Sequence, residues 1–220
     1  MKLNLERRPE SLRQSLVGAE DHCRNSRLAV GLDLGTTTGV TYTYLPPGGS
    51  VDPATLRYVF GQWDLSAGSY ESGAIRFVRL RHFLEALRPA LVAYEDVKFD
   101  MPVSQGLSAG ALMARVATAS ELLGAYKATV VAWCEERDIP CVGFKIATIK
   151  KRATNRGNAG KVDIIQACNT LFGTEFSTDG YENSGVDNIA DSAFVCRLAL
   201  EQYADGLLPS QSEITSGELP

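Results

Sequence analysis

The order of strand-type and helix-type segments constrains the fold of this chain more than any other feature of the sequence. Three strand-type segments come first, an apolar run of the buried type and then two segments rich in β-branched and aromatic residues, and strands and helices alternate after them. This order predicts an α/β fold, with an antiparallel meander leading into a mixed sheet on which helices pack. Predicted strands cover 28–34, 40–45, 55–63, 90–97 and 139–144, and predicted helices cover 72–88, 105–137 (as one helix or two), 161–171 and 187–203.

The length of 220 residues suits a single well-cored domain. We expect that domain at 28–204, after a polar, flexible extension at 1–27 and before a disordered tail at 205–220. No apolar run reaches the roughly 18 residues that a membrane span requires, and the first residues lack the apolar core of a secretory signal. Five widely spaced cysteines without a CxxC pair argue against a zinc site and a disulfide framework. We therefore expect a cytoplasmic protein without a membrane partner.

Four acidic residues stand where core elements begin or end. Asp33 lies among the apolar residues of one predicted strand, and Glu95 ends the apolar run of another. Asp187 and Asp191 lie four residues apart, on one face of a predicted helix. Taken alone, Asp33 could be a turn former before Gly35, Glu95 a surface strand end and Asp187 a helix cap. Taken together, without a histidine or cysteine cluster, they predict an all-oxygen site for Mg²⁺, with Mn²⁺ as a substitute. Such a site can hold two ions and direct water at a phosphodiester.

A basic run stands out against the net charge of −4. Six basic residues occur between 145 and 161 with no acidic residue among them, and local clustering sets the field that a phosphate backbone experiences. A solvated surface is the alternative interpretation of such a run. Because no acidic partner is near in sequence, and Gly and Asn residues precede a helix start at 161, DNA contact is favoured. The six are Lys145, Lys150, Lys151, Arg152, Arg156 and Lys161.

The ordered set of motifs resembles the RuvC-type Holliday junction resolvases, a family of the RNase H-like superfamily. GLDLGTTTG (31–39) is similar to the first motif of that family, and AYED (93–96) is similar to the second. Residues 123–144 resemble its helix and following strand without gaps, IKKRATNRGNAGK (149–161) its lysine segment, and DNIADSAF (187–194) its closing motif. The resemblance covers most of the chain, and its specificity lies in the order of the motifs.

The resemblance implies an RNase H-like five-stranded mixed sheet flanked by helices, and a homodimer that cuts four-way DNA junctions by paired nicks. It implies a divalent-metal-dependent endodeoxyribonuclease with two Mg²⁺ ions per site. The catalytic and metal-binding residues carried over are Asp33, Glu95, Asp187 and Asp191. The residues expected to contact DNA are Lys150, Lys151, Arg152, Arg156, Lys161 and the aromatic Phe99.

Three departures from the family pattern accompany this resemblance. The closing acids are spaced by four, where many relatives use three, and Asn188 occupies the three-spaced position, so Asp187 is the least secure ligand. An insertion at 97–122 and the N-terminal extension are also unusual. These departures fit a resolvase of a phage or another mobile element.

Other functions remain open on the sequence alone. The same catalytic residues would serve a nuclease acting on forks, flaps or RNA–DNA hybrids, and an inactive domain of this fold could only grip nucleic acid. GLDLGTTTG is also similar to the first phosphate loop of actin-like ATPases and kinases, although that duplicated fold requires roughly twice this length and a second such loop.

The small residues between Gln105 and Arg137 predict either a close-packed core helix or a dimer interface. For an interface, Ala125 and Ala128 would permit close approach. The expected apolar anchors are Leu122, Leu123, Val130, Val131 and Trp133.

Overall fold

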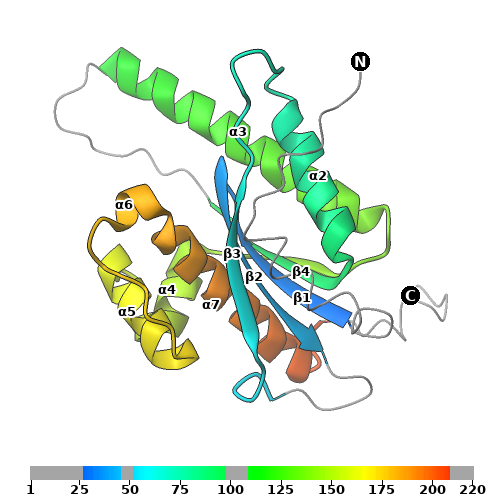
Figure 1. Cartoon of the computed structure of the whole chain (residues 1–220), viewed down its shortest axis with the longest axis vertical. Helices are drawn as coiled ribbons and strands as arrows, with labels where there is room; N and C mark the ends of the chain where they lie inside the picture. Colours follow the sequence, from blue (N-terminus) through cyan, green and yellow to red (C-terminus); the bar gives the residue numbers. More distant parts are fainter. Residues whose placement is uncertain (1–26, 46–51, 98–108, 209–220) are drawn as a thin grey trace.

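A central strand, β1, joins the antiparallel and parallel halves of one sheet (Figure 1). The computed structural model describes residues 27–45, 52–97 and 109–208, with side chains described in 28–45, 52–97 and 117–208. Strand β1 pairs antiparallel with β2 and parallel with β4, and the order across the sheet is β3-β2-β1-β4-β5. The five strands are β1 (Arg27–Asp33), β2 (Thr37–Leu45), β3 (Tyr58–Asp64), β4 (Pro89–Glu95) and β5 (Cys141–Phe144).

Helices cover both faces of this sheet (Figure 1). Two helices, α2 (Ile75–Leu87) and α3 (Ala109–Glu135), pack on one face. The other face is covered chiefly by α7 (Val186–Ala204), which crosses β1, β2 and β4, and α4 (Ile146–Thr154), α5 (Lys161–Phe172) and α6 (Tyr181–Ser184) pack around it. None of the helices in the described ranges is long and apolar enough to cross a membrane.

Alternation along β1 divides the apolar side chains between two cores. Leu28, Val30 and Leu32 enter the core under α2 and α3, whereas Ala29 enters the core under α7. A strand buried on both faces requires an almost continuous apolar run, which is what RLAVGLD provides. Because side chains alternate along a strand, Asp33 lies on the same face as Ala29, toward α7.

Two glycines let α7 approach the sheet closely. A Cβ atom on Gly31 would collide with the backbone of Ser192 and Cys196, and one on Gly39 would collide with the backbone of Asn188 and Ile189. A buried hydrogen bond of 2.8 Å between the hydroxyls of Thr41 and Ser192 fixes the same contact. The first half of α7 is therefore held directly against the carboxyl end of β1.

The structure refines several element predictions. Residues 109–135 form one helix, which settles the choice between one and two. Helix α4, within the basic run, was not predicted; in it Ile149 is buried while Lys151 is exposed. The single turn α6 was not predicted either. The predictions for 1–27, 205–220 and Phe99 lie outside the described residues, except for Arg27 and 205–208.

Candidate metal centre

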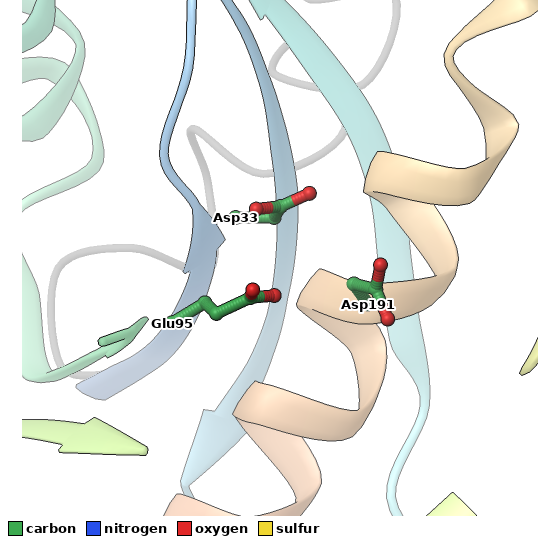
Figure 2. A group of neighbouring side chains, drawn as sticks. All are labelled: Asp33, Glu95 and Asp191. Carbon is green, nitrogen blue, oxygen red and sulfur yellow. The ribbon is translucent and has the colours of Figure 1, made fainter. Parts of the chain in front are cut away.

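Two carboxylates meet at the carboxyl end of the parallel strand pair. Asp33 is the last residue of β1 and Glu95 is the last residue of β4. The register pairs Leu32 with Tyr94, so the next residue on each strand is one of these acids. Both side chains point to the α7 face, as Figure 2 shows. Strand pairing alone thus brings together two residues that are far apart in the sequence.

Helix α7 adds a third carboxylate. Asp191 lies on the first half of this helix, and its side chain faces Asp33 and Glu95 (Figure 2). One carboxylate oxygen from each of the three residues lies within 4.8 Å of the others. The close approach at Gly31 and Gly39 makes this possible, because the short Asp191 side chain could not span a wider gap between helix and sheet.

Burial makes this cluster electrostatically costly. Burial, followed by the Glu95 and Asp191 charges, raises the pKa of Asp33 well above its ordinary value. Burial and Asp191 raise the pKa of Glu95 to about 7. Burial and Asp187 raise the pKa of Asp191 to about 6, with Lys161 acting in the opposite direction. A cation among the three oxygens would remove this repulsion.

The donor set fits a hard divalent cation. All three ligands are carboxylate oxygens, and no histidine or thiol in the described ranges joins them. Oxygen-only sites suit Mg²⁺ and Mn²⁺ better than zinc or copper. Asp33, Glu95 and Asp191 are therefore the residues that could hold the metal.

Asp187 occupies a different position from the other three predicted acids. It is buried with 6% exposure, and its Oδ2 accepts a hydrogen bond from Lys161 Nζ. It lies near enough to raise the pKa of Asp33 and Asp191, yet it is not in the group of converging oxygens. Asn188, at the three-spaced position, donates through Nδ2 to Thr37 O at 2.9 Å and holds α7 to β2.

Two lysines of the basic run face the acidic cluster. The positive charges of Lys150 and Lys161 both lower the pKa of Glu95 and of Asp191, so both lysines act electrostatically on the acidic cluster. Despite the opposing effect of burial, the carboxylates of Asp187, Asp191 and Asp33 raise the pKa of Lys161, so this lysine is charged at neutral pH. Side chains from α4 and α5 thus supply positive charge at one side of the cluster.

The sequence predicted that the basic run has no acidic partners, and this is wrong: three of its residues form ion pairs in the folded protein. Arg152 forms a bidentate pair with Glu201 of α7, with distances of 2.8 and 2.5 Å. Arg156 pairs with Asp163 at 3.1 Å, and Lys161 pairs with Asp187. These partners are distant in sequence or lie just beyond the run, which is why a count within 145–161 missed them. Within the described ranges, Lys145, Lys150 and Lys151 form no ion pair.

The anchors expected for a dimer interface are partly wrong. Val130 and Trp133 are 0% and 1% exposed inside the core of their own chain, so they are not available to a partner. Trp133 also donates through Nε1 to Glu85 Oε1 of α2 at 3.0 Å. Ala128 is exposed and Ala125 is half-buried. Within 117–135, the exposed side of α3 therefore includes small residues such as Ala128, together with Glu121 and Glu135.

The turn between β1 and β2 closes on itself. Gly35 N donates to Thr38 Oγ1 at 3.2 Å, and the Thr38 hydroxyl donates to Gly35 O at 2.7 Å. A phosphate loop of the actin-like kind offers its turn amides to a nucleotide, whereas the Gly35 amide is already hydrogen-bonded within the turn. This geometry does not favour the nucleotide-binding alternative.

A cleft beside Glu95 was not predicted from the sequence. It has a volume of about 360 Å³ and lies between the ends of β1 and β4 and helix α3. Lys127 Nζ and Asp96 Oδ1, 2.6 Å apart, form an ion pair at its edge. In the sequence, only Asp96, next to Glu95, hinted at this site. Its partner Lys127 lies on α3, and the sequence does not show that the two residues meet.

Known structures share this architecture. No protein-family model matches the sequence, and no curated protein matches it. The RuvC structure from Thermus thermophilus superimposes with a TM-score of 0.53 at 16% identity, covering 82% of this chain and 98% of that chain. T. thermophilus RuvC in complex with a Holliday junction substrate superimposes with a TM-score of 0.58 at 15% identity, covering 83% and 98%.

A third structure, the yeast mitochondrial Holliday junction resolvase, has a TM-score of 0.46 at 15% identity and covers 80% of this chain and 81% of that chain. The two RuvC superpositions confirm the predicted fold. The chain has an RNase H-like α/β fold, with a five-stranded mixed sheet flanked by helices.

Proposed function

We propose that this protein is a divalent-metal-dependent endodeoxyribonuclease that resolves four-way DNA junctions by paired hydrolytic nicks. The observation that carries the proposal is the convergence of Asp33, Glu95 and Asp191 within 4.8 Å at the carboxyl end of an RNase H-like sheet. Ligands of open α/β sheets commonly bind at this end of the strands. Among the described residues, Asp33 and Glu95 form no ion pair, so a bound cation explains this half-buried acidic group better than a role in stability does.

The three carboxylates are the proposed ligands, with Mg²⁺ as the metal and Mn²⁺ as a substitute. When bound, such an ion lowers the pKa of a coordinated water and polarises the phosphoryl oxygens. Asp187 would complete the four-acid set predicted from the sequence, and with it a site for two ions, only if its carboxylate left Lys161. A three-carboxylate set is complete without that rearrangement.

The lysines beside the cluster would hold the scissile phosphate. Lys161 is charged and half-exposed, and together with Lys150 it offers donors to a phosphate that approaches the acids. A cation fixed beside the phosphate also balances the negative charge that develops as the P–O bond breaks. Lys151 is free for backbone contacts, whereas Arg152 and Arg156 would first have to exchange their carboxylate partners. We retain Phe99 as a proposed DNA contact.

Branched DNA is the proposed partner, and a homodimer is the proposed active form. One of the neighbouring structures is RuvC of T. thermophilus with a Holliday junction substrate, and this chain shares the fold of that protein. A four-way junction has two equivalent strands, so a two-fold dimer would present one acidic centre to each strand. The outer face of α3, with its small residues, is the proposed contact surface.

A comparison of substrates tests this proposal most directly. The protein is incubated with Mg²⁺ or Mn²⁺ and with labelled four-way junction, fork, flap and RNA–DNA hybrid, side by side. Symmetrical cuts in the junction, dependent on metal, are expected. Preference for a fork, flap or hybrid would retain the nuclease and change its substrate. No cleavage of any substrate in either metal would contradict the proposed function.

A further inference from the structure

A second cleft, of about 390 Å³, lies at the edge of the sheet and away from the acidic centre. It is formed by the loop before β3, the first residues of β3, the end of α5 and the middle of α7. The register pairs Tyr58 of this cleft with Thr43, and Thr43 with Ala29, which precedes Asp33 by four residues on β1. The cleft is therefore toward the opposite end of the sheet from the proposed metal ligands.

Most of the wall of this cleft is apolar, and much of it is aromatic. Tyr58 and Phe60 of β3 lie edge to face with Phe172 of α5, with ring centroids 4.8 and 5.7 Å apart. Leu171, beside Phe172, is 44% exposed. β3 is an edge strand, and no other strand in the described ranges pairs with its outer side. Because edge strands and exposed apolar groups are commonly covered, both features predict that another segment covers this cleft.

The charged residues that line the cleft are two arginines, Arg57 and Arg197. Arg57 is exposed and forms no ion pair with another described residue. Arg197 donates through Nε to Glu201 Oε1 at 2.6 Å, but Glu201 also accepts two hydrogen bonds from Arg152. One carboxylate is thus shared by two guanidinium groups, which leaves positive charge at the cleft. An occupant that combines apolar side chains with carboxylates would complement both the walls and this charge.

Of the four segments of this chain that lie outside the described residues, only 209–220 has this composition. Its sequence, PSQSEITSGELP, contains Glu213 and Glu218, no basic residue, and the apolar Ile214 and Leu219. The other three do not match: 1–26 has more basic than acidic residues, 98–108 has one of each, and 46–51 has no charge. Charge complementarity therefore favours 209–220 as the occupant.

The point at which 209–220 begins also suits this cleft. Leu208, the residue before it, packs against the same core as Tyr58, Phe60 and Phe172. Residues 209–220 would span up to roughly 40 Å if extended, whereas the seven residues of β3 span roughly 23 Å. The segment is therefore long enough to reach the cleft from Leu208 within one chain.

We propose that residues 209–220 dock in the cleft of their own chain, with their apolar side chains against the aromatic wall and their glutamates near Arg57 and Arg197. Docking would cover the start of the β3 edge and would join the segment after α7 to β3. The proposal does not depend on nuclease activity, because the cleft is remote from the acidic centre.

Photo-cross-linking of the full-length protein tests the position of this segment. The protein carries the photo-reactive residue p-benzoylphenylalanine in place of Ile214 and is irradiated at low concentration, and mass spectrometry locates the cross-link. We expect a cross-link within one chain to the loop before β3, the start of β3 or the end of α5. No cross-link, or one to another surface, would overturn the proposal. A cross-link between two chains would place the segment of a second copy in the cleft and would overturn docking within one chain.

A charge in the apolar wall provides the matched comparison. Leu171→Glu should lower the yield of the cross-link by about 10-fold or more, because an unpaired carboxylate would be buried against apolar groups. Val162→Glu is the control, since Val162 is on the same helix, is 39% exposed and does not line the cleft. A yield that is unchanged in Leu171→Glu, or equally lowered in both variants, would overturn the assignment to this cleft.

Charge reversal tests the arginines and does not depend on Leu171→Glu being folded. Glu213→Lys combined with Glu218→Lys should lower the yield, because two positive charges then face the arginines. Adding Arg57→Glu should restore part of it, and general destabilisation would not give such a rescue. A yield that is insensitive to the tail charges, or is not restored by Arg57→Glu, would overturn the charge pairing. None of these measurements uses DNA, so their outcome is independent of the proposed function.

Discussion

At the scale of single residues, the candidate centre consists of groups that do not stabilise the protein by themselves. Asp33, Glu95 and Asp191 lie half-buried and close together, and their pKa values are raised. Burying like charges without a cation opposes folding. The lysines offset only part of this cost. The metal-free protein should therefore be less stable than its cores alone would make it.

Removing one of these charges should abolish activity and increase the stability of the metal-free protein. We expect Asp33→Asn to abolish cleavage and to raise the midpoint of thermal unfolding in EDTA at pH 8, because the amide removes a buried repulsive charge. Mn²⁺ should stabilise the wild type and not this variant. Differential scanning fluorimetry with and without Mn²⁺ measures both effects. Glu135→Gln, at an exposed position of α3, is the control. Cleavage by Asp33→Asn at the wild-type rate would refute the assignment of Asp33 as a metal ligand.

The raised pKa values also predict how stability depends on pH. In the unfolded chain these acids titrate near pH 4, whereas in the folded protein the pKa of Glu95 is about 7 and that of Asp191 about 6. Between about pH 4 and pH 7 the native state therefore binds more protons than the unfolded state. The free energy of unfolding is then highest below about pH 4 and falls as the pH rises through 6 and 7. Urea unfolding in EDTA from pH 5 to 8 should show this decline. Mn²⁺ should reduce it, and a stability that rises over this range would contradict the prediction.

Lys161 should have two separable roles. It neutralises the buried Asp187, so Lys161→Met should destabilise the protein by about 1–2 kcal/mol, a value lowered from that of a fully buried pair because the lysine is half-exposed. If it also contacts a phosphate, the variant should lower the salt slope of junction binding by about 0.9. Lys150→Met, without an ion pair to lose, should change the salt slope alone. If neither variant changed the salt slope of junction binding, residues 145–161 would be a solvated surface that does not contact DNA.

At the scale of secondary-structure elements, sequence periodicity predicted most of the fold. Alternation and apolar runs located all five strands within a few residues, and the two strand-end acids followed from them. Helix α4 was missed because its charged residues hid a helix that buries only Ile149. The pairings Arg152–Glu201 and Lys161–Asp187 join separate elements, so only the packing of α4 and α5 on α7 reveals them. Val130 and Trp133 were assigned to the wrong surface because an apolar pattern does not identify which partner covers it.

The contact between α7 and β1 gives an element-scale prediction. Gly31→Ala would place a methyl group against the backbone of Ser192 and Cys196, which cannot move without shifting the helix. We expect a loss of stability of about 1–3 kcal/mol, as for other overpacked sites, together with weaker Mn²⁺ binding because Asp191 moves away. Gly61→Ala on β3 is the control, since its nearest new contact is Val40 Cγ1 at 3.6 Å. Calorimetric Mn²⁺ titration and urea unfolding measure the two effects, and wild-type Mn²⁺ affinity in Gly31→Ala would contradict the proposed coupling.

At the scale of the whole molecule, each chain would carry one complete acidic centre, so two cuts require two chains. The sheet, its cores and the converging acids are all formed within one chain. Association is thus not needed to build the centre, and loss of the proposed dimer should affect the coordination of the cuts and not the fold.

Placing a charge on the outer face of α3 tests whether the fold of each chain is independent of paired cutting. Ala128→Arg should yield folded monomers that nick one strand slowly and lose paired cutting. Val78→Arg, at an exposed position of α2, should leave the proposed dimer intact. Analytical ultracentrifugation measures the mass, and a cruciform plasmid distinguishes linear product from open circles. A wild-type protein that sediments as a monomer at micromolar concentration and gives only open circles would contradict paired cutting.

The place of Asp191 on α7 has a consequence for the protein during its synthesis. Translation proceeds from the N-terminus, and the sheet residues emerge from the ribosome well before residues 186–204. Until α7 docks, the nascent chain has Asp33 and Glu95 but lacks the third carboxylate, and the α7 face of the sheet stays uncovered. A ribosome-bound chain stalled before residue 186 should therefore bind no Mn²⁺ at this centre. If the proposed function holds, DNA cleavage by this protein would begin only after α7 has been synthesised and has docked on the sheet.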